Sequence, residues 1–455
     1  FPTRRSSDLR QEKINMFRLN KYVHIIKNEN YIALFNFMNG KIILFVEAEA
    51  IDLINTVMET GELESDNAFA KQLIAQDFIV QSNVDEQKLI NYHYNQYVYN
   101  SERVEIIMIL SELCNFRCEY CYEEYEPTIM SSDIEEGVIH FIQDLIKTYH
   151  CKKLTISWFG GEPTLFKDRI IAFMQTVKKK IPEDIILNGY MTTNGYLLDF
   201  ENFLKYYNVG ITGYQITLDG FSHTHDELRK LKNGDATWDT IYKNLKAISD
   251  ADLENIDVLL RINYNEQVME DIFEFIEYVK KEFNNRFTIH AHPISKLGNE
   301  DRECICDYAF SEIAEEIIGE YFATSDIRND FSLLRCQTFG EICYASVPTS
   351  YAIDAKGVIR KCTVCLTDEK NKVGEIIDRE NFHMNFYALS QWTECKLSLD
   401  ECNNCEFYPV CVSRLCPNAV LEGSTECRFN KHAVYRHIEL VADMLYSKMM
   451  LNKPK

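Results

Sequence analysis

Three closely spaced cysteines are the residues of this sequence with the clearest chemical meaning. Cys114, Cys118 and Cys121 are separated by three and then by two other residues. Thiolates are soft ligands that suit zinc or iron–sulfur clusters. A structural zinc ion usually takes four protein ligands, whereas a [4Fe-4S] cluster held by three thiolates keeps one iron open to a small molecule. The triplet therefore favours such a cluster, with zinc as the alternative.

A second group of cysteines lies in the C-terminal part of the chain. Eight thiols are enough for two four-ligand clusters, and C-x2-C spacing also permits a pair of zinc ribbons. The eight are Cys336, Cys343, Cys362, Cys402, Cys405, Cys411, Cys416 and Cys427. Cysteines without a predicted ligand role are Cys151, Cys304, Cys306, Cys365 and Cys395. For Cys365 a spare ligand and a thiol near the substrate both stay open.

Glycine and polar residues follow the predicted strands at positions that could serve a bound cofactor. Gly160 and Gly161 come after the second strand and permit close backbone approach. Glu162 follows them and can accept a hydrogen bond from an ammonium group. Thr217 lies at the end of the fourth strand, and Arg229 comes shortly after it. These residues are candidates for cofactor binding.

From residue 103 onward, buried strands alternate with amphipathic helices that must position these residues. Hydrophobic runs predict strands at 104–110, 154–159, 185–193, 214–218, 258–262 and 287–291. Helical spacing predicts helices at 134–149, 170–180, 198–207, 238–249 and 268–283. Such alternation implies a parallel sheet with right-handed crossovers. We expect an α/β fold with a partial (β/α)6 TIM-like barrel over residues 100–300, with its chemistry at the C-terminal strand ends.

The triplet and the strand-end motifs together resemble the radical S-adenosylmethionine (SAM) superfamily. Its signature is C-x3-C-x2-C with an aromatic residue before the last cysteine, here Tyr120. The resemblance implies that the triplet holds a [4Fe-4S] cluster whose free iron binds SAM, giving a 5′-deoxyadenosyl radical on reduction. It implies cofactor-binding roles for Tyr120, Gly160, Gly161, Glu162, Thr217 and Arg229. For Arg229, a surface ion pair with Asp226 is the alternative.

The C-terminal cysteine pattern resembles the SPASM extension of radical SAM enzymes, which houses two auxiliary [4Fe-4S] clusters. We expect it at 336–455, after a connector at 301–335. Carried over by position, the ligands of the first auxiliary cluster are Cys336, Cys343, Cys362 and Cys416. Those of the second are Cys402, Cys405, Cys411 and Cys427. Four residues separate Cys411 from Cys416, where the family usually has three, so the assignment of Cys416 as a ligand is in question.

The N-terminal part of the chain predicts a smaller module at residues 16–95. Its strands and helices are expected at 22–26, 31–35, 41–45, 48–60 and 67–75. This order resembles the winged-helix peptide-recognition elements of enzymes that modify ribosomal peptides, and an ordinary helper domain is the alternative. The opening residues resemble the translation of a sequencing adapter. Residues 1–15 are therefore expected to be an artefact or a disordered tail.

The type of the residue after Cys362 helps to distinguish two possible reactions of the enzyme. Sulfatase-maturating relatives place an aspartate there as a candidate base, whereas this chain has Thr363, which cannot act as a carboxylate base. We therefore expect a maturase that forms a thioether or C–C cross-link in a ribosomally synthesised peptide. Anaerobic sulfatase maturation, which forms formylglycine, is the alternative, and a non-catalytic zinc-binding scaffold is a second one.

Composition limits the classes of partner. The 455 residues carry a formal net charge of −22, which disfavours nucleic acid, a tRNA substrate included, and polybasic membrane association. No apolar run approaches the ~20 residues of a membrane span. We expect a cytoplasmic enzyme whose partners are a precursor peptide with its leader and a one-electron reductant such as a flavodoxin or ferredoxin.

Overall fold

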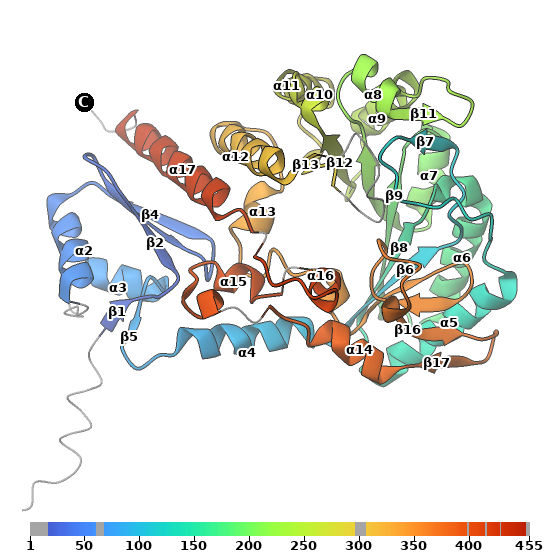
Figure 1. Cartoon of the computed structure of the whole chain (residues 1–455), viewed down its shortest axis with the longest axis horizontal. Helices are drawn as coiled ribbons and strands as arrows, with labels where there is room; N and C mark the ends of the chain where they lie inside the picture. The colour runs from blue at the N-terminus through green and yellow to red at the C-terminus, as the bar shows by residue number, and fades with distance from the viewer. Residues whose placement is uncertain are drawn as a thin grey trace, which may run out of the picture.

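The computed structural model describes residues 17–60, 68–295, 306–397, 400–414, 416–427 and 429–451. The predictions for residues 1–15, and for the part of the connector at 301–305 that includes Cys304, concern residues outside these ranges. Figure 1 shows a large α/β body, a small β-rich body formed by the N-terminal part of the chain, and C-terminal segments that run between the two.

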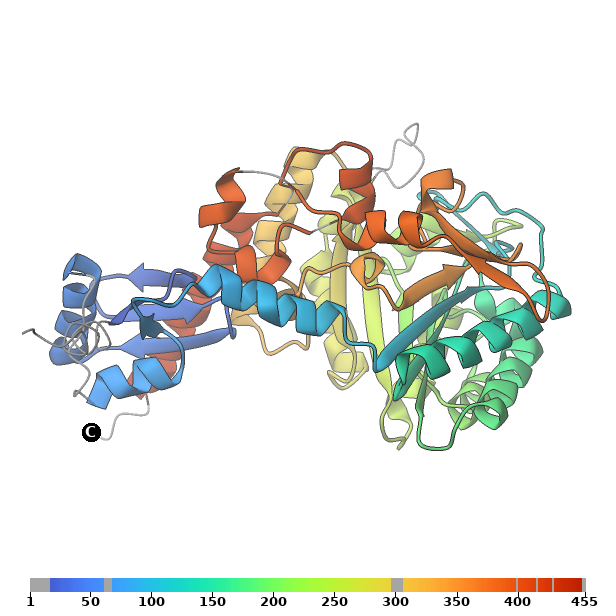
Figure 2. The same cartoon turned by 90° about the horizontal axis from the view of Figure 1, so that it is seen from below.

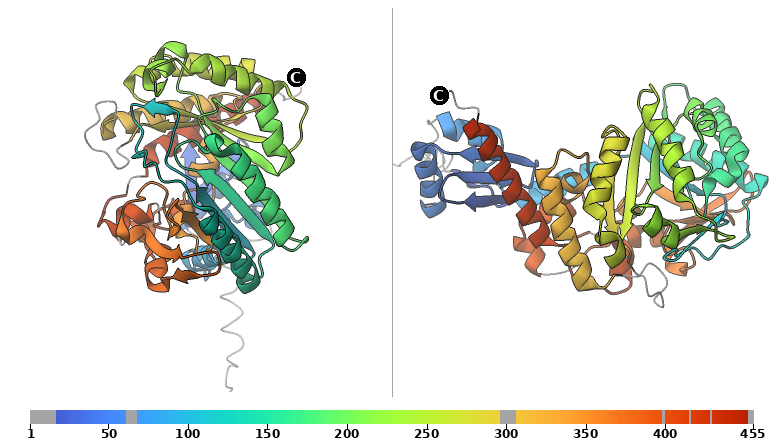
Figure 3. Two further views of the ribbon diagram at one scale, coloured as in Figure 1. Left: turned by 90° about the vertical axis from the view of Figure 1, so that its right-hand side faces the viewer. Right: turned by 90° about the horizontal axis from the view of Figure 1, so that it is seen from above.

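Within the described ranges, six parallel strands form the centre of the large body. They are β6 (Arg103–Ile109), β8 (Lys153–Phe159), β9 (Ile186–Thr193), β10 (Ile211–Thr217), β12 (Asp257–Tyr264) and β13 (Thr288–Pro293). Each strand pairs in parallel with the next one in sequence. The helices that connect them lie along the outside of the sheet (Figure 3). The predicted α/β fold with a mostly parallel, barrel-like sheet is confirmed.

The connecting helices follow the predicted pattern closely. They are α5 (Ser132–Tyr149), α6 (Lys167–Lys180), α7 (Phe200–Asn208), α9 (Trp238–Asp250), α10 (Glu266–Met269) and α11 (Ile272–Glu282). Helix α5 shows why the boundaries fall where they do. Ser131 caps its start by accepting a hydrogen bond from N of Ile134, and His150 ends it in the left-handed conformation. The one predicted helix at 268–283 is interrupted and becomes α10 and α11.

A continuous apolar run explains why most of strand β6 is buried on both faces. In β6, every residue from Ile106 to Ile109 is buried. Because successive side chains of a strand point to opposite faces, this burial means that both sides of the sheet are packed. Such runs are typical of strands in parallel sheets, and this run allowed the strand to be predicted from the sequence.

The sheet continues beyond β6 into the cysteine-rich region. Strand β14 (Ser350–Ile353) pairs in parallel with β6, with Tyr351 opposite Ile106. The antiparallel strands β15 (Val358–Arg360), β16 (Lys372–Ile376) and β17 (Phe382–Met384) follow it. Backbone hydrogen bonds therefore join the cysteine-rich region to the barrel, which the sequence analysis did not predict.

A separate antiparallel sheet forms the N-terminal body. Its strands are β2 (Val23–Lys27), β3 (Ile32–Asn36) and β4 (Lys41–Phe45). One face packs against α2 (Ala48–Thr60), α3 (Ala68–Ala75) and the pair β1 (Phe17–Leu19) and β5 (Ile79–Gln81). The predicted strands and helices are present, and the comparison of this module with a winged helix stays a prediction.

The opposite face of this sheet packs on the cysteine-rich region. The ring centroids of Phe37 and Phe407 lie 4.5 Å apart, and the ring of His24 stacks on Tyr435 at 4.4 Å. Tyr435 belongs to α17 (Lys431–Leu451), which lies beside α12 (Tyr308–Thr324) (Figure 3). Both faces of the N-terminal sheet are thus covered, and all five residues of β3 are buried.

Helix α4 (Glu86–Val98) runs from the N-terminal body to the parallel sheet (Figure 2). Asp85 caps it by accepting a hydrogen bond from N of Lys88. The hydroxyl of Tyr408 donates to Oδ1 of Asn91 at 2.6 Å and holds the helix against the cysteine-rich region. Among the helices that the structure describes, none combines the length and the apolar character needed to cross a bilayer.

Replacing Phe37 with alanine is expected to lower the free energy of unfolding by about 3–5 kcal/mol, because it empties a fully buried aromatic site between the N-terminal sheet and the cysteine-rich region. Chemical denaturation of the full chain measures the change. Phe386→Ala is the matched control, since that side chain is 66% exposed and should change stability little. Equal and small effects of both substitutions would contradict the packing of the N-terminal sheet on the cysteine-rich region.

Candidate functional site

The cysteine triplet lies on the segment that follows the carboxyl end of β6. Within it, β7 (Phe116–Cys118) pairs in antiparallel fashion with β11 (Arg229–Leu231). Cys118 stands opposite Arg229 in this pair. The pairing fixes the cysteine loop at the C-terminal ends of the strands, which is where barrels of this kind place their chemistry.

The thiols of the loop are partly buried. Burial raises the pKa of Cys114 to about 12, and the charges of Glu162, Cys118 and Cys121 act in the same direction. Burial also raises the pKa of Cys118 to about 11, opposed by Arg229. Thiolates are therefore unfavourable here without a positively charged partner. Iron ions supply that charge, so this donor set fits an iron–sulfur cluster.

Gly160 and Gly161 pack against the backbone just before Cys114. The backbone N of Gly161 donates to the carbonyl O of Ser111 at 3.2 Å. A Cβ atom at Gly161 would lie 2.3 Å from the carbonyl O of Glu112 and 2.4 Å from that of Leu113. Both glycines thus lie close to the backbone of the segment that carries Cys114, and their role in cofactor binding stays a prediction.

Glu162 is a buried anchor between two strand ends. Its carboxylate accepts hydrogen bonds from N of Thr164 at 2.9 Å, Oγ1 of Thr193 at 2.7 Å and N of Asn194 at 2.7 Å. Burial raises its pKa, and these hydrogen bonds oppose the rise. Its described contacts thus tie the end of β8 to the end of β9. The ammonium-binding role stays a prediction.

Tyr120 is the centre of a buried hydrogen-bond network at the strand ends. Its hydroxyl donates to the carboxylate of Asp219. It accepts from Nη1 of Arg229 at 2.7 Å and from Nδ2 of Asn263 at 3.0 Å. Oδ1 of Asp219 also accepts from the backbone N of Asn263 at 2.7 Å. The network therefore joins the cysteine loop to the ends of β10 and β12.

Arg229 is part of this network and does not pair with Asp226. Its Nη1 lies 4.0 Å from Oδ2 of Asp219, and both side chains are buried. Burial lowers the pKa of Arg229, but the neighbouring anionic groups outweigh it and the net pKa is raised. Asp226 instead accepts hydrogen bonds from N of Thr237 and N of Trp238 at the start of α9. The alternative of a surface ion pair is wrong.

Sequence reasoning missed Asp219 and Asn263, although their positions carried a signal. Asp219 comes just after β10, and Asn263 lies two residues after Arg261 on β12, so it shares a face with it. The register pairs Thr217 with Arg261, which places Thr217 on this same face. Polar residues on one face at neighbouring strand ends could have identified the network.

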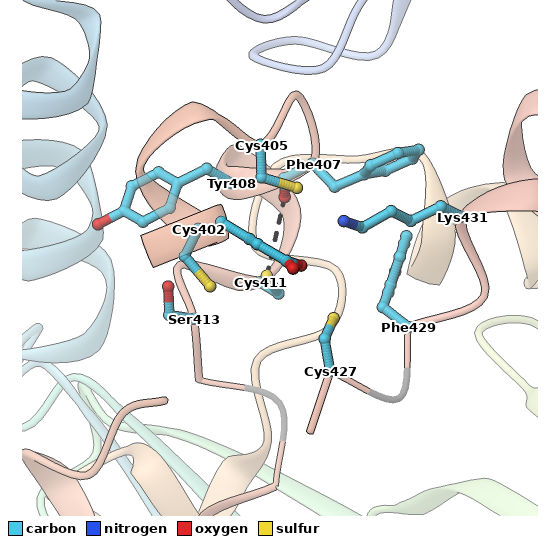
Figure 4. A pocket seen from close by; sticks show the side chains of 10 residues that line it. Cys402, Cys405, Phe407, Tyr408, Cys411, Ser413, Cys427, Phe429 and Lys431 are labelled. Carbon is cyan, nitrogen blue, oxygen red and sulfur yellow. Dashed lines mark hydrogen bonds between the residues drawn. The ribbon is translucent and has the colours of Figure 1, made fainter. Parts of the chain in front are cut away.

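Four of the predicted auxiliary ligands line one cavity in the C-terminal region (Figure 4). They are Cys402, Cys405, Cys411 and Cys427. Phe407, Tyr408 and Phe429 supply apolar walls, and the ammonium group of Lys431 points into the cavity. Burial raises the pKa of Cys411 to about 12, and burial raises that of Cys405, opposed by Lys431. Four free thiols and one cation converge here.

The other predicted set is only partly brought together. Burial raises the pKa of Cys343 to about 12, and the charges of Cys362 and Cys416 reinforce the rise, so these three thiols are neighbours. Cys336 instead packs in the core that contains Phe407 and the N-terminal sheet. In the part of the chain that the structure describes, every cysteine is a free thiol. Over the same residues, no three His, Cys, Asp or Glu side chains lie close enough to hold one metal ion.

Comparison with known proteins adds to this geometry. The family profile described as the Radical SAM superfamily matches residues 108–283. A cysteine-type anaerobic sulfatase-maturating enzyme of Clostridium novyi (strain NT) is 24% identical over 332 residues, covering 68% of this chain and 86% of that enzyme. An Fe-coproporphyrin III synthase of Methanosarcina barkeri (strain Fusaro / DSM 804) is 28% identical over 224 residues, covering 48% of this chain and 51% of that protein. The chain thus spans about half the length of this second relative.

Solved structures share the fold. The structure of native anSMEcpe with bound AdoMet has a TM-score of 0.60 at 14% identity and covers 75% of this chain and 98% of that one. The structure of Streptococcus suis SuiB bound to precursor peptide SuiA has a TM-score of 0.51 at 15% identity and covers 92% of this chain and 99% of that one. Radical SAM enzymes use a [4Fe-4S] cluster and SAM. The profile match and the cysteine loop that it contains identify residues 108–283 as a radical SAM domain.

Proposed function

We propose that this enzyme modifies a ribosomally synthesised precursor peptide by forming a thioether or carbon–carbon cross-link. The observation that carries the proposal is the attachment of two further groups of thiols to the radical SAM domain through β14, which pairs with β6. Loss of a hydrogen atom leaves a substrate radical, and closing a bond to a second group requires that one more electron and a proton leave. Auxiliary clusters beside the barrel are suitable acceptors for that electron.

Cys114, Cys118 and Cys121 are the ligands that we assign to the SAM-binding cluster. Cys402, Cys405, Cys411 and Cys427 are those we assign to the second auxiliary cluster. With SAM bound, the first of these clusters supplies a 5′-deoxyadenosyl radical that takes hydrogen from a strong C–H bond. The donor sets fit because buried thiols of raised pKa need a strong positive partner to become thiolates.

Arg229 is suited to bind the carboxylate of SAM. It is held cationic beside Cys118 by Asp219 and Tyr120. Among the described residues, nothing accepts a hydrogen bond from its buried Nε. A buried donor of this kind favours an acceptor from a ligand, since leaving it unpaired costs free energy. Thr217 lies on the same inward face at the end of β10 and completes this side of the proposed SAM site.

Two solved structures of this fold contain peptides, which supports a peptide substrate. SuiB was solved with precursor peptide SuiA, and anSMEcpe was solved with a Kp18Cys peptide. The N-terminal sheet of this chain has both faces covered, so a leader strand would add by β-augmentation to one of its edge strands, β2 or β4. A one-electron reductant such as a flavodoxin or ferredoxin is the other partner that this chemistry requires.

Anaerobic sulfatase maturation is the second candidate, favoured by the 24% identity to the Clostridium novyi enzyme. The presence of Thr363 argues against sulfatase maturation. Its hydroxyl lies 3.0 Å from the hydroxyl of Tyr344, and its backbone N donates to the same atom at 2.9 Å. A hydroxyl held in this way offers no carboxylate base at the position where sulfatase-maturating relatives have one.

Anaerobic reconstitution with iron and sulfide, followed by SAM, dithionite and the peptides encoded beside the gene, tests the proposal. We expect 5′-deoxyadenosine and a peptide that has lost two hydrogen atoms and does not react with a hydrazide probe. A hydrazide-reactive peptide would indicate formylglycine and the second candidate. A chain that binds zinc, stays colourless and releases no 5′-deoxyadenosine would support the non-catalytic scaffold.

A further inference from the structure

The loop that follows β15 carries two cysteines, Cys362 and Cys365, which are separated by two residues. The side chain of Asn371 organises this loop. Its Oδ1 accepts from the backbone N of Cys362 at 2.9 Å, and its Nδ2 donates to the carbonyl oxygens of Cys362 at 2.7 Å and Cys365 at 2.9 Å. Asn371 is fully buried, so the two cysteines are held on a fixed support.

Cys365 also reaches the segment that carries Cys416. Its Sγ donates to Oδ1 of Asn418 at 3.3 Å. Asn418 belongs to α16 (Pro417–Leu421), and Cys416 is the residue that precedes this helix. The two loops are therefore in direct contact through the Cys365 side chain.

Cys343 joins the same group from a third segment. It precedes Tyr344, whose hydroxyl accepts from N of Thr363, the residue after Cys362. Contacts between three separate segments thus place the loops of Cys343, Cys362, Cys365 and Cys416 side by side, although no three of these thiols, all of them in the described part of the chain, lie close enough to hold a single metal ion.

Cys336 does not belong to this group. It is 5% exposed and packs in the core of the N-terminal sheet and Phe407. Cys343 and Cys362 pack instead against the core of the parallel sheet. The distribution of the thiols therefore differs from the assignment by position, in which Cys336 completes the first auxiliary set.

The geometry points to Cys343, Cys362, Cys365 and Cys416 as the four ligands of the first auxiliary cluster, with Cys336 as a buried core residue. This inference rests on the proposed function, which supplies the cluster. A C-x2-C pair is a common way to present two thiolates to one iron–sulfur cluster. Cys395 is the competing candidate, because its thiol donates to the carbonyl O of Pro417, the residue after Cys416, but it has no described contact with Cys362.

The test is the iron and sulfide content of the reconstituted full chain, together with its reduced EPR spectrum. The wild type should bind about twelve iron ions, as expected for three cubane clusters. Cys365→Ala should lose about four of them or lose one cubane EPR signal, whereas Cys336→Ala should match the wild type. Cys365→Ser, which keeps a hydroxyl near Asn418, should retain a cluster with a shifted signal.

Each other outcome overturns the inference. Loss of a cluster in Cys336→Ala or Cys395→Ala, with Cys365→Ala unchanged, would assign the fourth ligand elsewhere. A wild-type chain that binds only about four iron ions would remove the auxiliary clusters, and with them the proposed function. Circular dichroism and retention of the SAM-binding cluster in Cys365→Ala separate ligand loss from failure to fold.

Discussion

Cys118→Ala is expected to abolish the reductive cleavage of SAM and to leave the C-terminal thiol sites able to bind iron. Cys118 is the middle residue of the triplet and the one that β7 pairs with Arg229 on β11. A cluster held by only three protein ligands has no spare one, so loss of one thiolate removes the site for SAM. 5′-Deoxyadenosine should fall to the background of a reaction without enzyme, and bound iron should drop from about twelve to about eight per chain.

Cys151→Ala is the matched control for this substitution. Cys151 is also a buried thiol, but it donates to the carbonyl O of Lys153 at the opposite end of β8. It should keep all bound iron and the wild-type rate of 5′-deoxyadenosine release. Continued SAM cleavage by Cys118→Ala would contradict the assignment of the triplet, whatever the C-terminal thiols bind.

Local patterns in the sequence were enough to predict the parallel sheet and the cysteine loop. Strand β6 is buried on both faces from Ile106 to Ile109 and has a continuous apolar run there, whereas β8 alternates buried with partly exposed residues. The cysteine triplet lies within eight residues, and its spacing alone limits the geometry that its thiols can adopt. Both features depend on residues that are close in sequence, where periodicity and spacing are informative.

The features that could not be predicted from the sequence depend on contacts between segments that are far apart in the chain. Nothing local shows that Tyr351 pairs with Ile106, or that Phe37 packs on Phe407, because each contact joins segments more than two hundred residues apart. The same limit applies to the auxiliary thiols. The spacing shows how many cysteines are available as ligands. Only the packing of three loops shows that Cys365 lies with the other thiols of this group and that Cys336 does not.

Gly161→Ala is expected to damage the cluster site, although it removes no ligand. The added Cβ would lie 2.3 Å from the carbonyl O of Glu112 and 2.4 Å from that of Leu113. Both obstacles are backbone atoms just before Cys114, and N of Gly161 and N of Glu162 donate hydrogen bonds to this same segment. The clash can be relieved only by moving the chain that carries the first cysteine of the triplet.

The expected cost of Gly161→Ala is about 3 kcal/mol of unfolding free energy, at the upper end for an overpacked site. Displacement of Cys114 should also lower the rate of 5′-deoxyadenosine release by ~10²-fold, since misplacing a reactive group by about 1 Å has an effect of that order. Anaerobic denaturation and a SAM-cleavage assay measure the two quantities. Gly234→Ala is the control for backbone strain, because its φ is +91° but no atom lies within 4 Å of the added Cβ. It should cost about 1–2 kcal/mol and leave the rate unchanged. If Gly161→Ala kept wild-type cleavage, the contact between this glycine and the cysteine loop would have no part in holding the cluster site.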